Sequence, residues 1–227
     1  MAPRTGRDTL LPRLPEVRLP PLRPYPGGPL AADAEYDELE FTGFDLSGQN
    51  ARGARFLECA LDRCTLDETA LRRARLIGCA LTGVRGVGTD LAEASLREVE
   101  LTDARLGGVQ LHGATLDRVL VRGGKIDYLN LRRAVLKDVV FADCVLVEPD
   151  FAEARLERVA FRGCVLRRAE LSGARLTQVD LRTVAELDIA RGVDRLSGAV
   201  ISPSQLLDLA PVFAAQLGVR VEALPGG

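Results

Sequence analysis

A large apolar residue at almost every fifth position, from Phe41 to Leu181, constrains this chain most. Steps of five from Phe41 give 29 centre positions, of which 20 are Leu and 5 are Phe. The departures are Ala51, Gly86, Val121 and Ile126. A period of five fits neither the 3.6-residue helix nor the two-residue strand. The chain is therefore expected to turn a corner every five residues, as a solenoid does.

A second inward position lies two residues before each centre, and it repeats every twenty residues. One such series is an unbroken alanine ladder: Ala54, Ala74, Ala94, Ala114, Ala134, Ala154 and Ala174. The next series is equally distinct: Leu39, Cys59, Cys79, Val99, Val119, Val139, Val159 and Val179. Twenty residues per repeat and five per corner predict four sides per coil. Coils about 4.8 Å apart would make seven coils a rod of roughly 34 Å.

Units such as residues 94–98 (Ala-Ser-Leu-Arg-Glu) and 174–178 (Ala-Arg-Leu-Thr-Gln) resemble those of pentapeptide-repeat proteins. The resemblance implies an all-β fold, a right-handed quadrilateral β-helix, and we expect a short helical cap at its C-terminal end. It implies less about function. The best understood members mimic DNA in shape and charge, bind DNA gyrase and protect it from quinolones and other poisons.

The sequence divides into a proline-rich arm (1–32), the repeat region (33–201) and a terminal segment (202–227). Eight of the twelve prolines lie in the first thirty residues. Because proline lacks a backbone donor, we expect this arm to be extended or disordered rather than packed into a sheet, with recognition by a proline-reading module as an alternative. Acidic residues between Asp33 and Glu40 would keep a further strand from adding to the first coil.

The five-residue pattern frays after Leu181, with Glu186 and Arg191 at centre positions. Ser202 is then expected to cap a helix that has Pro203 in its first turn. Pro211 predicts a break, giving two short helices at about 203–210 and 211–217. Their apolar residues would cap the last coil or form a homodimer, as in the gyrase-binding members that the chain resembles; capping is favoured because it needs no partner. They are Leu206, Leu207, Leu209, Val212, Phe213 and Leu217.

Composition supports one folded core, with 47% hydrophobic and 27% charged residues. No apolar run is long enough to cross a membrane, and no secretory cleavage pattern is present, so a cytoplasmic location is expected. All five cysteines occupy small inward positions, which favours reduced, buried thiols over disulfides or a metal site. They are Cys59, Cys64, Cys79, Cys144 and Cys164.

Catalysis has little support in the sequence. His112 is the only histidine and is expected to point outward on a convex rod, without the pocket or orienting partner that a general base needs. Gly86 would either leave a gap in the core or let the backbone bend inward; the segment lacks the Lys-Ser/Thr of a phosphate-binding loop. We therefore predict a non-enzymatic protein with no cofactor, no metal and no small-molecule substrate.

Outward residues can be sorted by the corner at which they project. The basic edge has a net charge of +7 and contains Arg52, Arg55, Arg72, Arg73, Arg75, Arg132, Arg133, Arg155 and Arg175. The acidic edge has a net charge of −5 and contains Asp67, Glu68, Asp90, Asp127, Glu148, Asp150 and Glu170. The other two edges come to −3 and +2, so the rod is polarised rather than uniformly acidic.

This charge distribution weighs against strong DNA mimicry. A duplex of similar length would present on the order of twenty negative charges, at about one per 1.7 Å. The basic edge could instead contact an acidic protein or a nucleic-acid backbone. The structural alternative is that its arginines pair with the flanking acidic edges.

Outward aliphatic residues gather toward the later coils and predict an apolar contact patch, covered by a terminal segment or by a partner subunit. They are Leu120, Val135, Val140, Val145, Val147 and Val165. The function that the sequence favours is a macromolecular binding scaffold acting through its charged edges and C-terminal region. The alternatives are a DNA-mimicking modulator of gyrase and a binder of nucleic acid or an acidic partner through the basic edge. The sequence does not name the partner or the oligomeric state.

Overall fold

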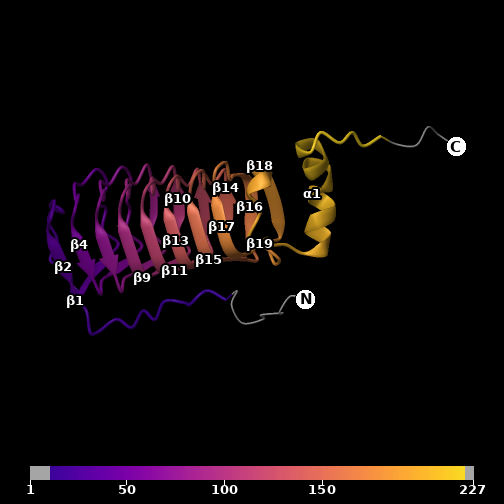
Figure 1. Cartoon of the computed structure of the whole chain (residues 1–227). Coiled ribbons are helices and arrows are strands. Elements are labelled where there is room, and N and C mark those ends of the chain that lie inside the picture. Colours follow the sequence, from indigo (N-terminus) through magenta and orange to yellow (C-terminus); the bar gives the residue numbers. More distant parts are fainter. Residues whose placement is uncertain (1–10, 223–227) are drawn as a thin grey trace.

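The computed structural model describes residues 11–222, and its strands form a parallel β-helix of about nine turns (Figure 1). The first ten residues of the predicted arm and residues 223–227 of the terminal segment lie outside the described residues. Strands one coil apart pair in register at a spacing of twenty residues, for example Leu116 with Leu136. The four-sided fold predicted from the two nested repeats is therefore confirmed.

Two adjacent sides belong to one 13-stranded sheet, and a third side is a separate six-stranded sheet. The large sheet starts with short strands: β1 (Arg23–Pro24), β2 (Glu35–Asp37), β3 (Leu39–Thr42), β4 (Arg55–Leu57), β5 (Ala60–Asp62), β6 (Arg75–Ile77) and β7 (Ala80–Thr82). Longer strands then span both of its sides: β9 (Ser95–Thr102), β11 (Thr115–Arg122), β13 (Val135–Ala142) and β15 (Arg155–Arg162). It ends with β17 (Arg175–Asp180) and β19 (Ala199–Val200). The third side contains β8 (Arg85–Val87), β10 (Arg105–Gly107), β12 (Lys125–Asp127), β14 (Val145–Val147), β16 (Val165–Glu170) and β18 (Glu186–Arg191). Single bridges, such as Asn130 with Asp150, hold the fourth side.

The corners have one recurring backbone conformation. Among residues 11–222, nineteen non-glycine residues have a positive φ, and every one lies two residues after a centre position or after that five-residue phase continued back from Phe41. Glycines such as Gly43 and Gly123 occupy the same phase. The left-handed conformation is unfavourable for residues with a Cβ atom. The coil geometry therefore imposes this conformation, whichever residue occupies the corner.

The interior contains the predicted ladders. All seven alanines of the alanine ladder are buried, and so are the five cysteines. Each of Cys59, Cys64 and Cys79 donates a weak hydrogen bond to a carbonyl oxygen 23 residues earlier, at 3.3 Å. The thiols thus serve as small core side chains that also satisfy backbone acceptors.

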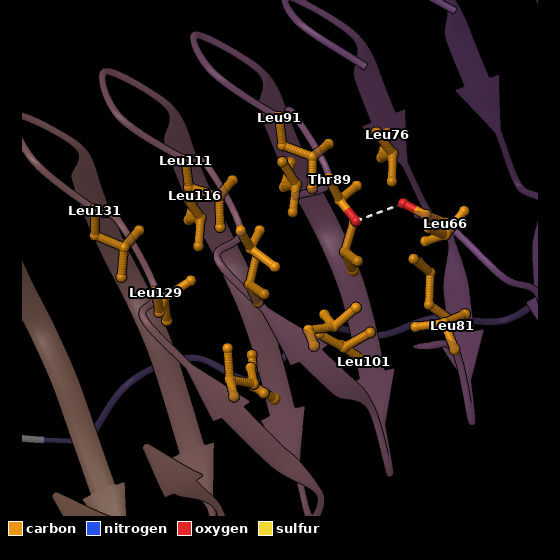
Figure 2. A pocket seen from close by; sticks show the side chains of 18 of the residues that line it. Leu66, Leu76, Leu81, Thr89, Leu91, Leu101, Leu111, Leu116, Leu129 and Leu131 are labelled. Atoms are coloured by element: carbon orange, nitrogen blue, oxygen red, sulfur yellow. Dashed lines mark hydrogen bonds between the residues drawn. The ribbon is translucent and has the colours of Figure 1, made fainter. Parts of the chain in front are cut away.

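The chain at Gly86 leaves no room for a side chain, and a cavity remains in the core nearby. A Cβ atom at Gly86 would lie 2.9 Å from the carbonyl carbon of Leu66 and 2.9 Å from Oγ1 of Thr89. The Thr89 hydroxyl donates to the Leu66 carbonyl at 2.7 Å (Figure 2). An apolar cavity of about 70 Å³ lies beside them, lined by leucines that include Leu81 and Leu101. Gly86 itself has no room for a Cβ atom, while space remains among the leucines nearby.

The N-terminal arm is extended but is not independent of the sheet. The Arg23 amide donates to the Glu38 carbonyl at 2.9 Å, and the Tyr25 amide donates to the Glu40 carbonyl at 2.8 Å. The expectation that the arm stays out of the sheet is wrong at β1, because this strand needs few donors and Pro24 lies at its exposed edge. The core also begins before residue 33, because Tyr25 stacks on Phe41 with ring centroids 4.3 Å apart.

The last coil contains a one-residue register shift. Leu187, and not Glu186, pairs with Leu166, whereas Ala199 again pairs with Val179 at the usual spacing of twenty. A short 3₁₀ helix, η1 (Val193–Arg195), lies within this turn. The sequence pattern frays here because one extra residue moves the apolar centre along the chain.

A single helix, α1 (Pro203–Gln216), follows the last coil. Ser202 and Gln205 form the predicted N-terminal cap as a reciprocal capping box. The predicted break at Pro211 is wrong, because Pro211 lies inside the continuous helix. The carbonyl that loses its partner belongs to Leu207, which is 75% exposed, so water can replace the missing donor. Within residues 11–222, no helix is long and apolar enough to cross a membrane.

Candidate binding surfaces

The basic edge is divided into two clusters by the register of the coils. Arg55 pairs with Arg75 near the first coils, and Arg155 pairs with Arg175 near the last ones. In the coils between them the same column contains residues such as Ser95 and has no arginine. The nine arginines predicted for this edge therefore do not form one continuous stripe.

More than half of these arginines are engaged in ion pairs with carboxylates of neighbouring coils. Arg72 and Arg73 both contact Glu93, and Arg133 Nε lies 2.9 Å from Glu153 Oε2. These guanidinium groups hold the pKa of Glu93 and of Glu153 below their usual range. Two further pairs join Arg132 to Asp150 at 2.8 Å and Arg55 to Glu35 at 3.6 Å. Four edge arginines form no ion pair within residues 11–222: Arg52, Arg75, Arg155 and Arg175.

The acidic edge is largely occupied by structural contacts. Asp90 and Asp150 each accept a hydrogen bond from the amide two residues ahead, at 3.0 and 2.9 Å, and so cap the following turn. Glu170 caps its own turn through the Ser172 amide at 2.7 Å. The remaining contacts are Asp67 with the Val87 amide, Asp127 with Lys125, and Glu148 with Arg168. Glu68 adopts the positive-φ corner conformation. Turn capping therefore explains much of the acidic content of this edge.

The six residues of the predicted apolar patch lie on three different faces. Leu120 and Val140 are buried on the outer face of β11 and β13, beside Ala142 and Ala160. Val135 is 41% exposed at the start of β13, in the column of the basic edge. The other three, Val145, Val147 and Val165, lie partly buried on β14 and β16 of the third side. The structure does not bring them together as one patch.

The N-terminal arm covers the part of this patch that contains Leu120 and Val140. The arm lies alongside the rod, past the row from β9 to β15 (Figure 1). Its Arg13 amide donates to Asp138 Oδ1 at 3.1 Å, and the prolines on either side of that contact, Pro12 and Pro15, are buried. Asp138 lies two residues before Val140 on β13. The arm therefore packs on the outer face of the large sheet.

The contact between the arm and the rod includes a row of alternating charges. Arg158 binds both carboxylate oxygens of Asp138, at 2.7 and 2.8 Å. Arg118 contacts Glu98, whose Oε2 also accepts the Glu16 amide at 3.2 Å. The guanidinium of Arg158 keeps the pKa of the buried Asp138 below its usual range. The Asp138 side chain is therefore ionised when it holds the arm.

The terminal helix is attached to the rod by few of its predicted apolar residues. Leu209 is buried and Phe213 is partly buried. The Gln205 side chain is also buried, and its amide donates to the carbonyls of Leu181 and Val184 at 2.8 and 3.3 Å. The remaining members of the predicted set are exposed: Leu206, Leu207, Val212 and Leu217. The helix caps the last coil through Gln205 and Leu209 and leaves its other apolar residues exposed, in its first turns as well as near its end.

One basic feature was missed when the sequence was sorted by edges. Arg85, Arg105 and Lys125 are direct neighbours in register on β8, β10 and β12. They border a shallow hollow of about 650 Å³ whose floor includes Gly107 and Leu106. We call these three cations the basic row. Following Arg85 in steps of twenty residues would have identified the row. Summing the charges of all three outward positions at each corner instead hid it within an edge of net charge +2.

The other features considered for catalysis do not converge on a site. His112 is half-buried in a turn of the fourth side. Within the described part of the chain, no three His, Cys, Asp or Glu side chains are placed to hold a metal ion. The fold and these surfaces define a β-helical rod whose distinctive groups lie on its outer faces.

Comparison with known families identifies this rod more closely. A model described as a pentapeptide repeat region matches residues 54–131, and one described as pentapeptide repeats in eight copies matches residues 144–182. The two segments together cover more than half of the chain. The chain belongs to the pentapeptide-repeat proteins.

The QnrB1 structure shows the same fold at low sequence identity. The structure of QnrB1, described as a plasmid-mediated fluoroquinolone resistance protein, aligns with a TM-score of 0.53 at 16% identity, covering 85% of this chain and 93% of that one. HetL from the cyanobacterium Nostoc sp. strain PCC 7120, a pentapeptide-repeat protein involved in heterocyst differentiation regulation, aligns with a TM-score of 0.32 at 24% identity, covering 77% and 92%. No curated protein sequence matches the chain.

Proposed function

We propose that this protein is a non-catalytic, cytoplasmic binding scaffold that holds a macromolecular partner through its charged outer faces and C-terminal region. The observation that carries this proposal is the presence of cations in register on a rigid rod without acidic partners among residues 11–222. Arg75, Arg155 and Arg175 on the basic edge and Arg105 in the basic row are of this kind. Unpaired charges in fixed positions favour recognition of an oppositely charged partner.

The terminal helix supports a second contact. Leu206 and the adjacent Leu207 are 51% and 75% exposed, and Leu217 just after the helix is 79% exposed. Exposed aliphatic side chains near one another on a helix are typical of contact surfaces. This surface would join two copies of the chain into a homodimer or would contact the partner directly.

Variant-dependent capture tests the scaffold function. The tagged full-length chain, incubated with extract of its own host cells, is expected to enrich at least one protein, identified by mass spectrometry. Enrichment should fall when Arg75, Arg155 and Arg175 are replaced by Glu, when Arg105 is replaced by Glu, or when Leu206 and Leu217 are replaced by Ser. Thr177→Ala is the matched control on an exposed strand position. Absence of any enriched protein, or equal enrichment by all variants, would contradict the proposal.

Modulation of DNA gyrase is the second candidate, favoured by the likeness in fold to a fluoroquinolone resistance protein. The charge distribution weighs against it, because duplex DNA presents about one charge per 1.7 Å and the acidic edge is occupied by turn capping and ion pairs. A supercoiling assay with purified gyrase, with and without a quinolone, separates the two. Inhibition or drug protection at micromolar protein would favour gyrase, and no effect would favour the general scaffold.

Direct binding of nucleic acid by the basic edge is a third candidate. Its support is the exposure of Arg75, Arg155 and Arg175, and its weakness is the gap between the two arginine clusters. Salt-sensitive retention of duplex DNA, abolished by replacing these three arginines with Glu, would favour it.

A further inference from the structure

The basic row places three cations where the fold gains nothing from them. Arg85, Arg105 and Lys125 are paired directly across strands, and strands of one sheet are about 4.8 Å apart. Like charges directly opposite each other destabilise a sheet. The surrounding contacts relieve this repulsion at the two ends of the row only.

The central cation lacks such relief. Arg85 Nε donates to Thr65 Oγ1 at 3.0 Å, and Lys125 Nζ lies 2.7 Å from Asp127 Oδ2. Arg105 lies between them and forms no hydrogen bond or ion pair through its side chain within residues 11–222. An anion above the row would neutralise it and relieve the repulsion from both neighbours.

The floor beside the row is open to a ligand. Two residues after Arg105, the middle coil has Gly107, which has no side chain to fill the hollow. Leu106, between them, is only partly buried. At Gly124 a Cβ atom would lie 2.1 Å from the Ala104 carbonyl oxygen, so the backbone itself forms this wall of the hollow. Most of the hollow's surface is apolar, and Val87 at its margin is 66% exposed.

The same column changes from basic to aliphatic in the next two coils. Lys125 pairs in register with Val145, and Val145 pairs with Val165. Val147 lies beside them on β14. Three cations are thus followed by a valine cluster along one side of the rod, at the strands labelled β10, β14 and β16 in Figure 1.

We propose that this side of the rod binds an extended acidic segment of a protein partner, with carboxylates on the basic row and aliphatic side chains on Val145, Val147 and Val165. This inference rests on the proposed scaffold function and assigns it a surface. An extended segment places the side chains of one face about 6.6 to 6.8 Å apart, so two or three carboxylates reach the row. The aliphatic contacts add apolar burial and set the direction of the segment.

A nucleic-acid backbone fits this surface less well. The basic row spans only about 10 Å over its three coils. The valine cluster offers a phosphate backbone no partner. A peptide with acidic residues in its first half and aliphatic residues in its second half matches both the basic row and the valine cluster.

The test is fluorescence anisotropy of the full-length chain with a fluorescein-labelled nine-residue peptide. The peptide has Glu at positions one, three and five, Leu at seven and nine, and Ser elsewhere. Saturable binding is expected, weakening as NaCl rises from about 50 to 200 mM. Arg105→Glu should weaken binding about tenfold, because it removes one charge-assisted contact and adds a repulsive charge. Val145→Ser should weaken it about threefold.

Arg97→Glu is the matched control, since Arg97 is exposed on β9 and forms no ion pair within residues 11–222; it should stay within about twofold of the parent. If Arg105→Glu loses the far-ultraviolet circular dichroism signal of the folded chain, Arg105→Gln replaces it, with about threefold weaker binding expected.

Three binding results would overturn the proposal. They are equal binding of a peptide with Gln for Glu, tighter binding of a nine-nucleotide oligothymidylate, and parental affinity of both Arg105 variants. So would an Arg105-dependent dimer in light scattering, because the occupant would then be a second copy. In the capture experiment, the triple variant of Arg75, Arg155 and Arg175 could prove to be the only one that fails to enrich the partner. That result would overturn the assignment of binding to the basic row and would leave the scaffold function intact.

Discussion

At the residue scale, the five-residue phase determines what each position must do. The centre and the position two before it point inward, and the position two after a centre adopts a left-handed backbone. The sequence predicted the first two because side-chain size reveals them. It did not predict the third, because Glu, Arg and Asp together are more frequent there than Gly. Gly86 was ambiguous for a related reason: only the structure shows that a Cβ atom there would lie 2.9 Å from the Leu66 backbone.

Glycines with similar φ should differ widely in their tolerance of a side chain. A Cβ atom at Gly124 would lie 2.1 Å from the Ala104 carbonyl oxygen. A Cβ atom at Gly43 would have no neighbouring heavy atom within 4 Å. Gly43→Ala should cost about 1 kcal/mol from the left-handed φ alone. Gly124→Ala should cost about 3 kcal/mol or more, since a backbone clash is added to the same φ cost. Urea unfolding of the two variants measures this difference, and equal losses would contradict it.

At the element scale, the ends of the rod departed most from the sequence pattern. The coils were predicted well because every coil repeats the same apolar signal. The arm and the helix lack that repetition, so their positions depend on single contacts such as the Arg13 amide with Asp138 and the Gln205 amide with Leu181. Such contacts join residues far apart in the chain, and no local sequence pattern predicts them.

The Gln205 side chain should be the main polar link between α1 and the last coil. Gln205→Ala leaves the buried carbonyls of Leu181 and Val184 without their side-chain donor and should cost about 2 kcal/mol. Hydrogen exchange in α1 should rise accordingly. Gln216→Ala at the exposed end of the same helix is the control and should change stability by less than about 0.5 kcal/mol. Unchanged exchange in Gln205→Ala would show that Leu209 packing alone holds the helix.

At the scale of the whole molecule, the sequence yielded net charges per edge but not their pairing. Arg72 and Arg73 both reach Glu93 on the next coil, which depends on side-chain reach across the corner. The basic row was missed because each edge pooled three positions per coil, whereas the structure aligns single positions twenty residues apart. The pairing of charges therefore depends on columns rather than on edges, and columns are readable from the sequence once the register is fixed.

The ion pair of Asp138 with Arg158 beneath the arm should make the free energy of unfolding depend on pH. Because Arg158 lowers the folded-state pKa of Asp138, its contribution is present above the unfolded pKa of about 3.9 and is lost as pH falls through the folded value. Asp138→Asn should cost about 2 kcal/mol at pH 7, with the difference from the parent shrinking in acid. Exposed Asp143→Asn is the control. Urea unfolding at pH 7 and pH 3, with trypsin cleavage at Arg13 as a measure of arm release, checks this. A pH-independent difference would contradict it.

The arm also changes how the rod should unfold. In a solenoid each coil contacts only its neighbours, so coils can be lost one at a time from an end. Here β1 is paired with β3 in the first coils, while the Arg13 amide is bonded to Asp138, more than a hundred residues farther along. The first coils cannot separate without releasing that distant contact. A single extended segment therefore joins a nearest-neighbour stack into one cooperative unit.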